Sequence, residues 1–99
     1  MIRVRNMTSE RSGREVANQF CIREGQNVYF QSYDSVIVKF NRTNNEVIFD
    51  KNTWNYSTTT SKYRNKFMRE ELGLYTSVAE CRKAIDEGNA SAQTNNAVK

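Results

Sequence analysis

Basic side chains recur along residues 62–69 at a spacing that would gather them on one side of a helix. At 100° per residue, Lys62, Lys66 and Arg69 form one stripe, and Arg64 stands between the first two in the sequence. Cations placed in this way are the groups that contact phosphates. The predicted contacts to nucleic acid or to another partner are Lys62, Arg64, Lys66, Arg69, Arg3 and Arg5.

A run of hydroxyl side chains, Thr58-Thr59-Thr60-Ser61, comes directly before these cations. Hydroxyl groups at the start of a helix accept hydrogen bonds from the backbone N–H groups of its first turn, which have no partner inside the helix. The same N–H groups, together with Lys62, Arg64 and Lys66, are also suited to hold a phosphate. The sequence leaves both interpretations open and favours the capping one. The residues on which the fold is expected to depend are Trp54, Tyr56 and Thr59.

The composition excludes most catalytic machinery. The 99 residues contain no histidine, so Ser-His-Asp and Cys-His arrangements are absent from the sequence, and two cysteines are too few for a zinc site. Cys21 and Cys81 are expected to be buried, reduced thiols. The carboxylates have no spacing typical of a hydrolase or a magnesium site. We expect no enzyme activity, no metal, no cofactor and no small-molecule substrate.

The elements that would position these residues change in type near residue 50. Before it, four short runs rich in β-branched and aromatic residues predict strands at 16–22, 27–33, 35–40 and 46–49, joined by turns into an antiparallel meander. After it, helices are predicted at 62–72, ended by Gly73, and at 78–87, between a Ser77 cap and Gly88. The expected buried residues of this part are Tyr63, Phe67, Leu74, Val78, Cys81 and Ile85.

The predicted fold class is α+β, with about four antiparallel strands packed against two C-terminal helices in a single domain over residues 15–88. Residues 1–14 carry four arginines against one glutamate and show no sustained period, which predicts a disordered, mobile basic arm. Residues 89–99 are small, polar and aperiodic, which predicts a disordered tail.

Two phrases of the sequence carry a resemblance to a known family. Phe30-Gln31-Ser32-Tyr33 reads F-x-S-Y, and residues 54–67 read W-x-Y-S-x-T-T-x-K-Y-R-x-x-F. In these phrases the chain resembles a family of small uncharacterised tailed-bacteriophage proteins, over roughly residues 18–88. The resemblance implies a phage origin and a fold type. The family has no assigned activity, so the resemblance implies no catalytic residues.

Two functional hypotheses follow from the charge and the resemblance. With a net charge of +4, the chain is expected to be a non-catalytic, phage-encoded accessory protein that engages nucleic acid, or a host nucleoprotein complex, through its basic helix face and arm. The alternative is a protein-binding inhibitor of a host defence machine, of the anti-CRISPR or anti-restriction type, acting for example by strand addition at a sheet edge. A helix-turn-helix over 65–84 is disfavoured, because Arg69 and Arg82 fall where that motif needs small or apolar residues.

The sequence also indicates where the protein acts. No run approaches the roughly 20 apolar residues of a membrane span, and the N-terminus lacks the apolar region of a signal peptide. We therefore expect the host cell cytoplasm, with no membrane partner.

Overall fold

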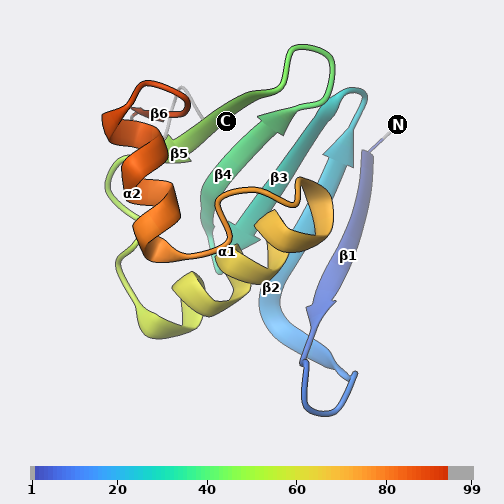
Figure 1. The fold of residues 1–99 in the computed structure, drawn as a ribbon. Helices are drawn as coiled ribbons and strands as arrows, with labels where there is room; N and C mark the ends of the chain where they lie inside the picture. The colour runs from blue at the N-terminus through green and yellow to red at the C-terminus, as the bar shows by residue number, and fades with distance from the viewer. Residues whose placement is uncertain (1, 94–99) are drawn as a thin grey trace.

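Among the described residues, six strands form one sheet whose strand order follows the order of the chain (Figure 1). The computed structural model describes residues 2–93. Each of the first five strands pairs antiparallel with the next, whereas the sixth pairs parallel with the fifth. The strands are β1 (Ile2–Thr8), β2 (Glu15–Glu24), β3 (Asn27–Ser32), β4 (Ser35–Asn41), β5 (Glu46–Asp50) and β6 (Ser91–Gln93).

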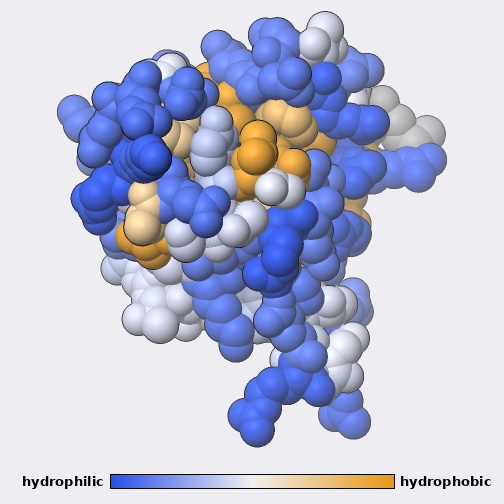
Figure 2. All heavy atoms as spheres, in the orientation of Figure 1, coloured by the Kyte–Doolittle hydropathy of each residue, from blue (hydrophilic) through white to orange (hydrophobic). Residues whose placement is uncertain are grey.

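Two helices, α1 (Thr58–Glu71) and α2 (Val78–Asp86), lie on the same face of this sheet (Figure 1). The α+β class and the two C-terminal helices are confirmed. The predicted number of strands, about four, is wrong, because a strand is added on each side of the meander. Figure 2 shows the helix-bearing face, which is mostly hydrophilic and exposes a small hydrophobic area.

The core fills the space between the helices and the sheet. Phe30 of β3 stacks on Phe67 of α1 with ring centroids 5.8 Å apart. The ring centroids of Phe49 of β5 and Trp54 are 5.9 Å apart. A register shift between β3 and β4 lets the adjacent residues Ile37 and Val38 both enter the core. Cys21 and Cys81 are buried and free, as predicted.

The predicted disordered arm is wrong for residues 2–8, which form β1. The strand pairs with β2 from Ile2 to Asn6 without interruption, and Met7 is fully buried in the core between the sheet and the helices. The Asn6 side chain adds a hydrogen bond of 3.1 Å from its Nδ2 to the Val16 carbonyl. Backbone pairing with β2 and the burial of Met7 thus order a segment whose arginines suggested mobility.

The predicted disordered tail is also wrong in its first part. Ala90 is buried against the core, and residues 91–93 form β6 beside β5. The Lys51 backbone N–H donates to the Gln93 carbonyl over 2.7 Å, which fixes the end of this pairing. The remaining part of the predicted tail, residues 94–99, lies outside the described residues.

Helix α1 begins four residues earlier than predicted. Its cap is Ser57, whose hydroxyl accepts from the Thr60 N–H over 3.1 Å, so the threonines lie inside the first turn. Thr60 is buried and hydrogen-bonded to Ser32 Oγ over 2.9 Å, whereas Thr59, the expected contributor to the fold, is exposed. The helix ends before Gly73, which has a φ of 73°, and Leu74 beyond it is exposed rather than buried.

Helix α2 is capped as the sequence predicts. Ser77 Oγ accepts from the Glu80 N–H over 3.2 Å, and Glu80 Oε1 accepts from the Thr76 N–H over 3.2 Å. The helix buries Cys81 and Ala84, and Ile85 packs against the core while partly exposed.

Candidate functional site

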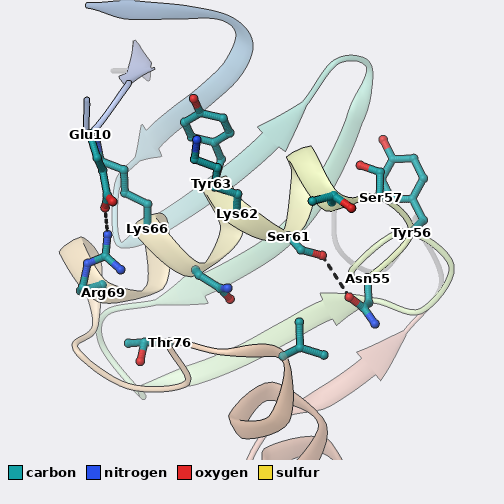
Figure 3. A pocket seen from close by; sticks show the side chains of 13 residues that line it. Glu10, Asn55, Tyr56, Ser57, Ser61, Lys62, Tyr63, Lys66, Arg69 and Thr76 are labelled. Carbon is teal, nitrogen blue, oxygen red and sulfur yellow. Dashed lines mark hydrogen bonds and ion pairs between the residues drawn. The ribbon is translucent and has the colours of Figure 1, made fainter. Parts of the chain in front are cut away.

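An open cleft of about 690 Å³ runs along the outer side of α1. Its walls come from the β1–β2 loop, from the segment that leads into α1 and from the connection between α1 and α2 (Figure 3). The cleft is lined by Glu10, Asn55, Tyr56, Ser57, Thr58, Ser61, Lys62, Tyr63, Asn65, Lys66, Arg69, Thr76 and Val78. Three of the six predicted site residues, Lys62, Lys66 and Arg69, are therefore brought together here.

Lys62 and Arg69 are exposed on the side of α1 where the sequence places them. The Lys62 ammonium lies 5.5 Å from the centre of the Tyr63 ring. Arg69 forms an ion pair with Glu10 of the β1–β2 loop (Figure 3), and about half of each of these two side chains is exposed. Both cations remain open to a ligand.

Lys66 lines the cleft but is only 7% exposed. Its ammonium donates to the Thr8 carbonyl and, over 2.9 Å, to Thr8 Oγ1 at the end of β1. The prediction of Lys66 as an exposed contact is wrong, because β1 lies where the sequence was interpreted as a mobile arm. The side chain contributes its charge to the cleft while tying α1 to the edge of the sheet.

Arg64 is 0% exposed, so the prediction of a partner contact there is wrong. Its guanidinium lies 5.3 Å from the centre of the Trp54 ring and donates to the Trp54 carbonyl and, over 2.8 Å, to Asn65 Oδ1. Burial lowers the pKa of Arg64. Arg82 of α2 lies 5.4 Å from the same ring, so the Trp54 indole is paired with two cations.

This arrangement explains the physical role of the W-x-Y-S-x-T-T-x-K-Y-R phrase. Trp54 supplies both a ring and a carbonyl to Arg64, and Ser57 and Thr60 begin the helix between them. Tyr56, on which the fold was expected to depend, is instead 51% exposed and lines the cleft.

Arg3 and Arg5 do not reach the cleft. They border a second hollow of about 510 Å³ on the helix side of β1 and β2, lined by Arg3, Val4, Arg5, Cys21 and Arg23. Glu71, at the end of α1, accepts hydrogen bonds there from Arg23 over 2.8 Å and from Arg5 over 3.3 Å. The predicted single basic surface is therefore divided into two.

The Glu71 carboxylate is nearly buried beside this second hollow, in contact with Arg5 and Arg23. Its burial by itself raises the pKa of Glu71, but hydrogen bonds from Arg23 and Cys21 and the charges of Arg23 and Arg5 together outweigh burial, so the pKa lies below its ordinary value of 4.5. Burial, followed by the charge of Glu71, raises the pKa of the Cys21 thiol to about 11. Sequence reasoning missed Arg23 and Glu71, whose partners lie 48 to 66 positions away.

The electrostatics of the α1 cleft are positive. Lys62, Lys66 and Arg69 face one carboxylate, Glu10, and that carboxylate is already paired. The first turn of α1 contains no acidic residue, so the positive end of the helix dipole at the mouth of the cleft is not neutralised by its own turn. Sequence reasoning missed Asn55 and Thr76, because the connecting segments that contain them show no period, and it also missed Asn65 of α1.

Within residues 2–93, no three histidine, cysteine, aspartate or glutamate side chains are grouped so that they could hold a metal ion. The two helices described there are also too short and too polar to cross a membrane.

Comparison with known proteins places the chain in a family without indicating a function. Residues 2–87 match the model of a family of unknown function, DUF8033. No curated protein and no solved structure matches the chain.

Proposed function

Because the chain belongs to the DUF8033 family, whose function is unknown, we propose its function from the geometry of the α1 cleft. The protein acts as a non-catalytic accessory binding protein that engages nucleic acid, or a nucleic-acid-handling complex, through this cleft. The residues that make the contact are Lys62 and Arg69, with Lys66 adding its charge from the wall.

The composition of the cleft lining carries this proposal. Cations, amides and hydroxyls are the side chains that contact phosphate and sugar in protein–nucleic acid complexes. The cleft offers all three kinds, with amides from Asn55 and Asn65 and hydroxyls from Ser57 and Ser61. Glu10, the one carboxylate that lines it within residues 2–93, is held by Arg69.

A phosphate can displace Glu10 from Arg69 at small cost. The two side chains are 51% and 56% exposed, and exposed ion pairs contribute at most about 1 kcal/mol. Release of this pair frees a guanidinium that binds phosphate with two parallel hydrogen bonds. The exposed ring of Tyr56, at the other end of the cleft, provides a surface on which an unpaired base stacks.

The phage origin is a further part of this proposal. It is supported by the resemblance of residues 30–33 and 54–67 to tailed-bacteriophage proteins. With that origin, the host cell cytoplasm is the proposed location.

Inhibition of a host defence machine by protein binding, of the anti-CRISPR or anti-restriction type, is the second candidate. The outer edge of β1 favours it, because β1 has one strand neighbour within residues 2–93. A partner protein can use such an edge by adding a strand to it.

Fluorescence anisotropy with single-stranded and duplex DNA and RNA tests the first candidate. The double variant K62Q/R69Q removes one lysine and one arginine from the cleft. Its matched control is R42Q/K83Q, which removes one of each from exposed positions that do not line the cleft. We expect micromolar binding that weakens with salt, and in K62Q/R69Q a salt slope reduced by about 1.8 on duplex DNA.

The control variant should keep its affinity within about threefold, because distant exposed charges are screened at physiological salt. Equal losses in the two double variants would mean that net charge, and not the cleft, attracts the nucleic acid. Absence of binding by the parent chain at low salt would refute the nucleic-acid proposal.

A further inference from the structure

Strand β1 forms an exposed edge of the sheet. It lies at the rim, with β2 as its one strand neighbour in the described part of the chain (Figure 1). Natural edge strands are commonly blunted by proline, by a bulge, by charged side chains or by a covering segment, and of these β1 has the charged side chains of Arg3 and Arg5. This chain has no proline, and the register irregularity of β1 falls after Asn6, which leaves Ile2–Asn6 regular.

The two sides of β1 differ in chemistry. Arg3 and Arg5 point to the helix side of the sheet, where they pair in register with Arg23 and Cys21. Ile2 and Val4 alternate with them, point to the opposite side and are each 59% exposed. The edge is therefore cationic on one side and apolar on the other.

A hollow lies beside β1 on each side of the sheet. The hollow on the helix side, of about 510 Å³, contains the three arginines Arg3, Arg5 and Arg23. The hollow on the opposite side, of about 190 Å³, is mainly apolar and is lined by Ile2, Ile22, Glu24, Tyr29 and Val36. Side chains of a strand added to β1 would point alternately toward the two hollows.

Building on the second candidate function, on which this inference rests, we propose that β1 binds an extended segment of a partner protein in which acidic and apolar residues alternate, as a seventh strand of the sheet. The acidic residues meet Arg3 and Arg5, and the apolar residues cover Ile2 and Val4. Backbone hydrogen bonds to β1 supply affinity, while the two hollows supply the sequence preference.

The charge of the helix-side hollow favours an acidic segment. Three arginines face two carboxylates, and Glu71 is shared between Arg5 and Arg23, while Glu70 lies 3.7 Å from Arg5. Arg3 forms no ion pair with any of residues 2–93. The hollow therefore keeps a positive charge that an incoming carboxylate neutralises.

The same charges disfavour a second copy of this chain. Antiparallel pairing of β1 with another β1 would bring Arg3 and Arg5 of both copies together on one face. Like charges directly opposite each other destabilise a strand pair. The partner is thus a different protein, and the exposed Ile2 and Val4 favour a peptide over a nucleic acid.

Binding of short labelled peptides to the full chain tests this proposal. The first peptide alternates glutamate and valine over eight residues, the second has the same composition in two blocks, and the third alternates lysine and valine. We expect the alternating acidic peptide to bind at least tenfold more tightly than either of the others. It should also slow amide hydrogen exchange within residues 2–6.

The variant R3E should weaken this binding at least tenfold, since Arg3 has the uncompensated charge. Its matched control is R11E, which makes the same change of charge in the exposed β1–β2 loop and should bind as the parent does. A thermal melt of R3E that overlays the parent melt shows that the fold is intact. The variant V4T serves as a second variant that keeps the charge. It should weaken binding by removing apolar contact.

Three results would overturn the proposal. The first is equal binding of the alternating acidic peptide and the block peptide. The second is unchanged amide hydrogen exchange of residues 2–6 when peptide is bound. The third is displacement of the peptide by a duplex oligonucleotide that binds R3E more weakly than the parent chain. The last would identify the arginines as a phosphate site. Because K62Q/R69Q leaves this edge untouched, failure here is distinguishable from failure of the α1 cleft.

Discussion

Replacing Thr60 by valine tests how α1 is anchored to the sheet. Thr60 Oγ1 and Ser32 Oγ lie 2.9 Å apart, and both side chains are buried. Valine keeps the shape and the β-branching of threonine, so T60V removes one hydroxyl and leaves Ser32 Oγ without this partner. A buried polar group that loses its hydrogen bond costs about 1–3 kcal/mol, so we expect the free energy of unfolding to fall by about 2 kcal/mol.

Urea denaturation and a thermal melt, both followed by circular dichroism, measure this loss. In a domain of this size, about 2 kcal/mol lowers the melting temperature by roughly 10 °C. The matched control is T59V, because Thr59 occupies the same helical turn but is exposed. Its effect should stay within about 0.5 kcal/mol.

A double variant, S32A/T60V, separates the lost hydrogen bond from lost packing. Since neither hydroxyl then remains unpaired, the double variant should lose less stability than the sum of the single losses. Equal destabilisation by T59V and T60V, or strict additivity in the double variant, would refute the role assigned to this hydrogen bond.

Three further predictions concern buried groups. R64K should lower the free energy of unfolding by about 2 kcal/mol, as measured by urea denaturation. The reason is that lysine lacks the planar guanidinium, which donates to the Trp54 carbonyl and to Asn65 Oδ1 at the same time. A loss below about 0.5 kcal/mol would contradict this. E71Q should be less stable than the parent at pH 7. Because the pKa of Glu71 is lower in the folded state, this difference in stability should shrink as the pH falls from 4.5 through that lower pKa. Denaturation curves at pH 7 and pH 3 measure the difference, and a difference independent of pH would refute the prediction. Cys21, with a pKa of about 11, and the buried Cys81 should react with a thiol reagent at pH 8 only after urea is added, and fast reaction of the native protein would show that they are accessible.

Much of the fold was predictable from local patterns. The alternation of β-branched and aromatic residues located the four central strands, and the Ser77–Glu80 pair located the start of α2. These signals lie within a few residues of the structure that they specify.

The outer strands were not predictable in this way, because long-range contacts stabilise them. The arginines of β1 resemble a mobile arm until Glu71, 66 positions after Arg5, is placed beside them. The three residues of β6 are too few to show a period, and they pair with β5 only after both helices have returned the chain to the sheet.

The candidate site was predictable in part, and the errors have one physical cause. A helical projection places Lys62, Lys66 and Arg69 on one stripe, but it cannot show which neighbours cover the stripe. The end of β1 covers Lys66, and Trp54 covers Arg64. Lys62 and Arg69, which no strand covers within the described residues, were correctly placed on the surface.

The agreement between strand order and chain order favours rapid folding. Each of the first four strand pairings joins consecutive segments through a short turn, so little chain entropy is lost when each hairpin closes. Folding rates rise when contacting residues are close in the sequence. The β5–β6 contact, the one parallel pairing among the described strands, must instead span both helices. We therefore expect it to form last, and its amide protons to be the first of the sheet to exchange with solvent.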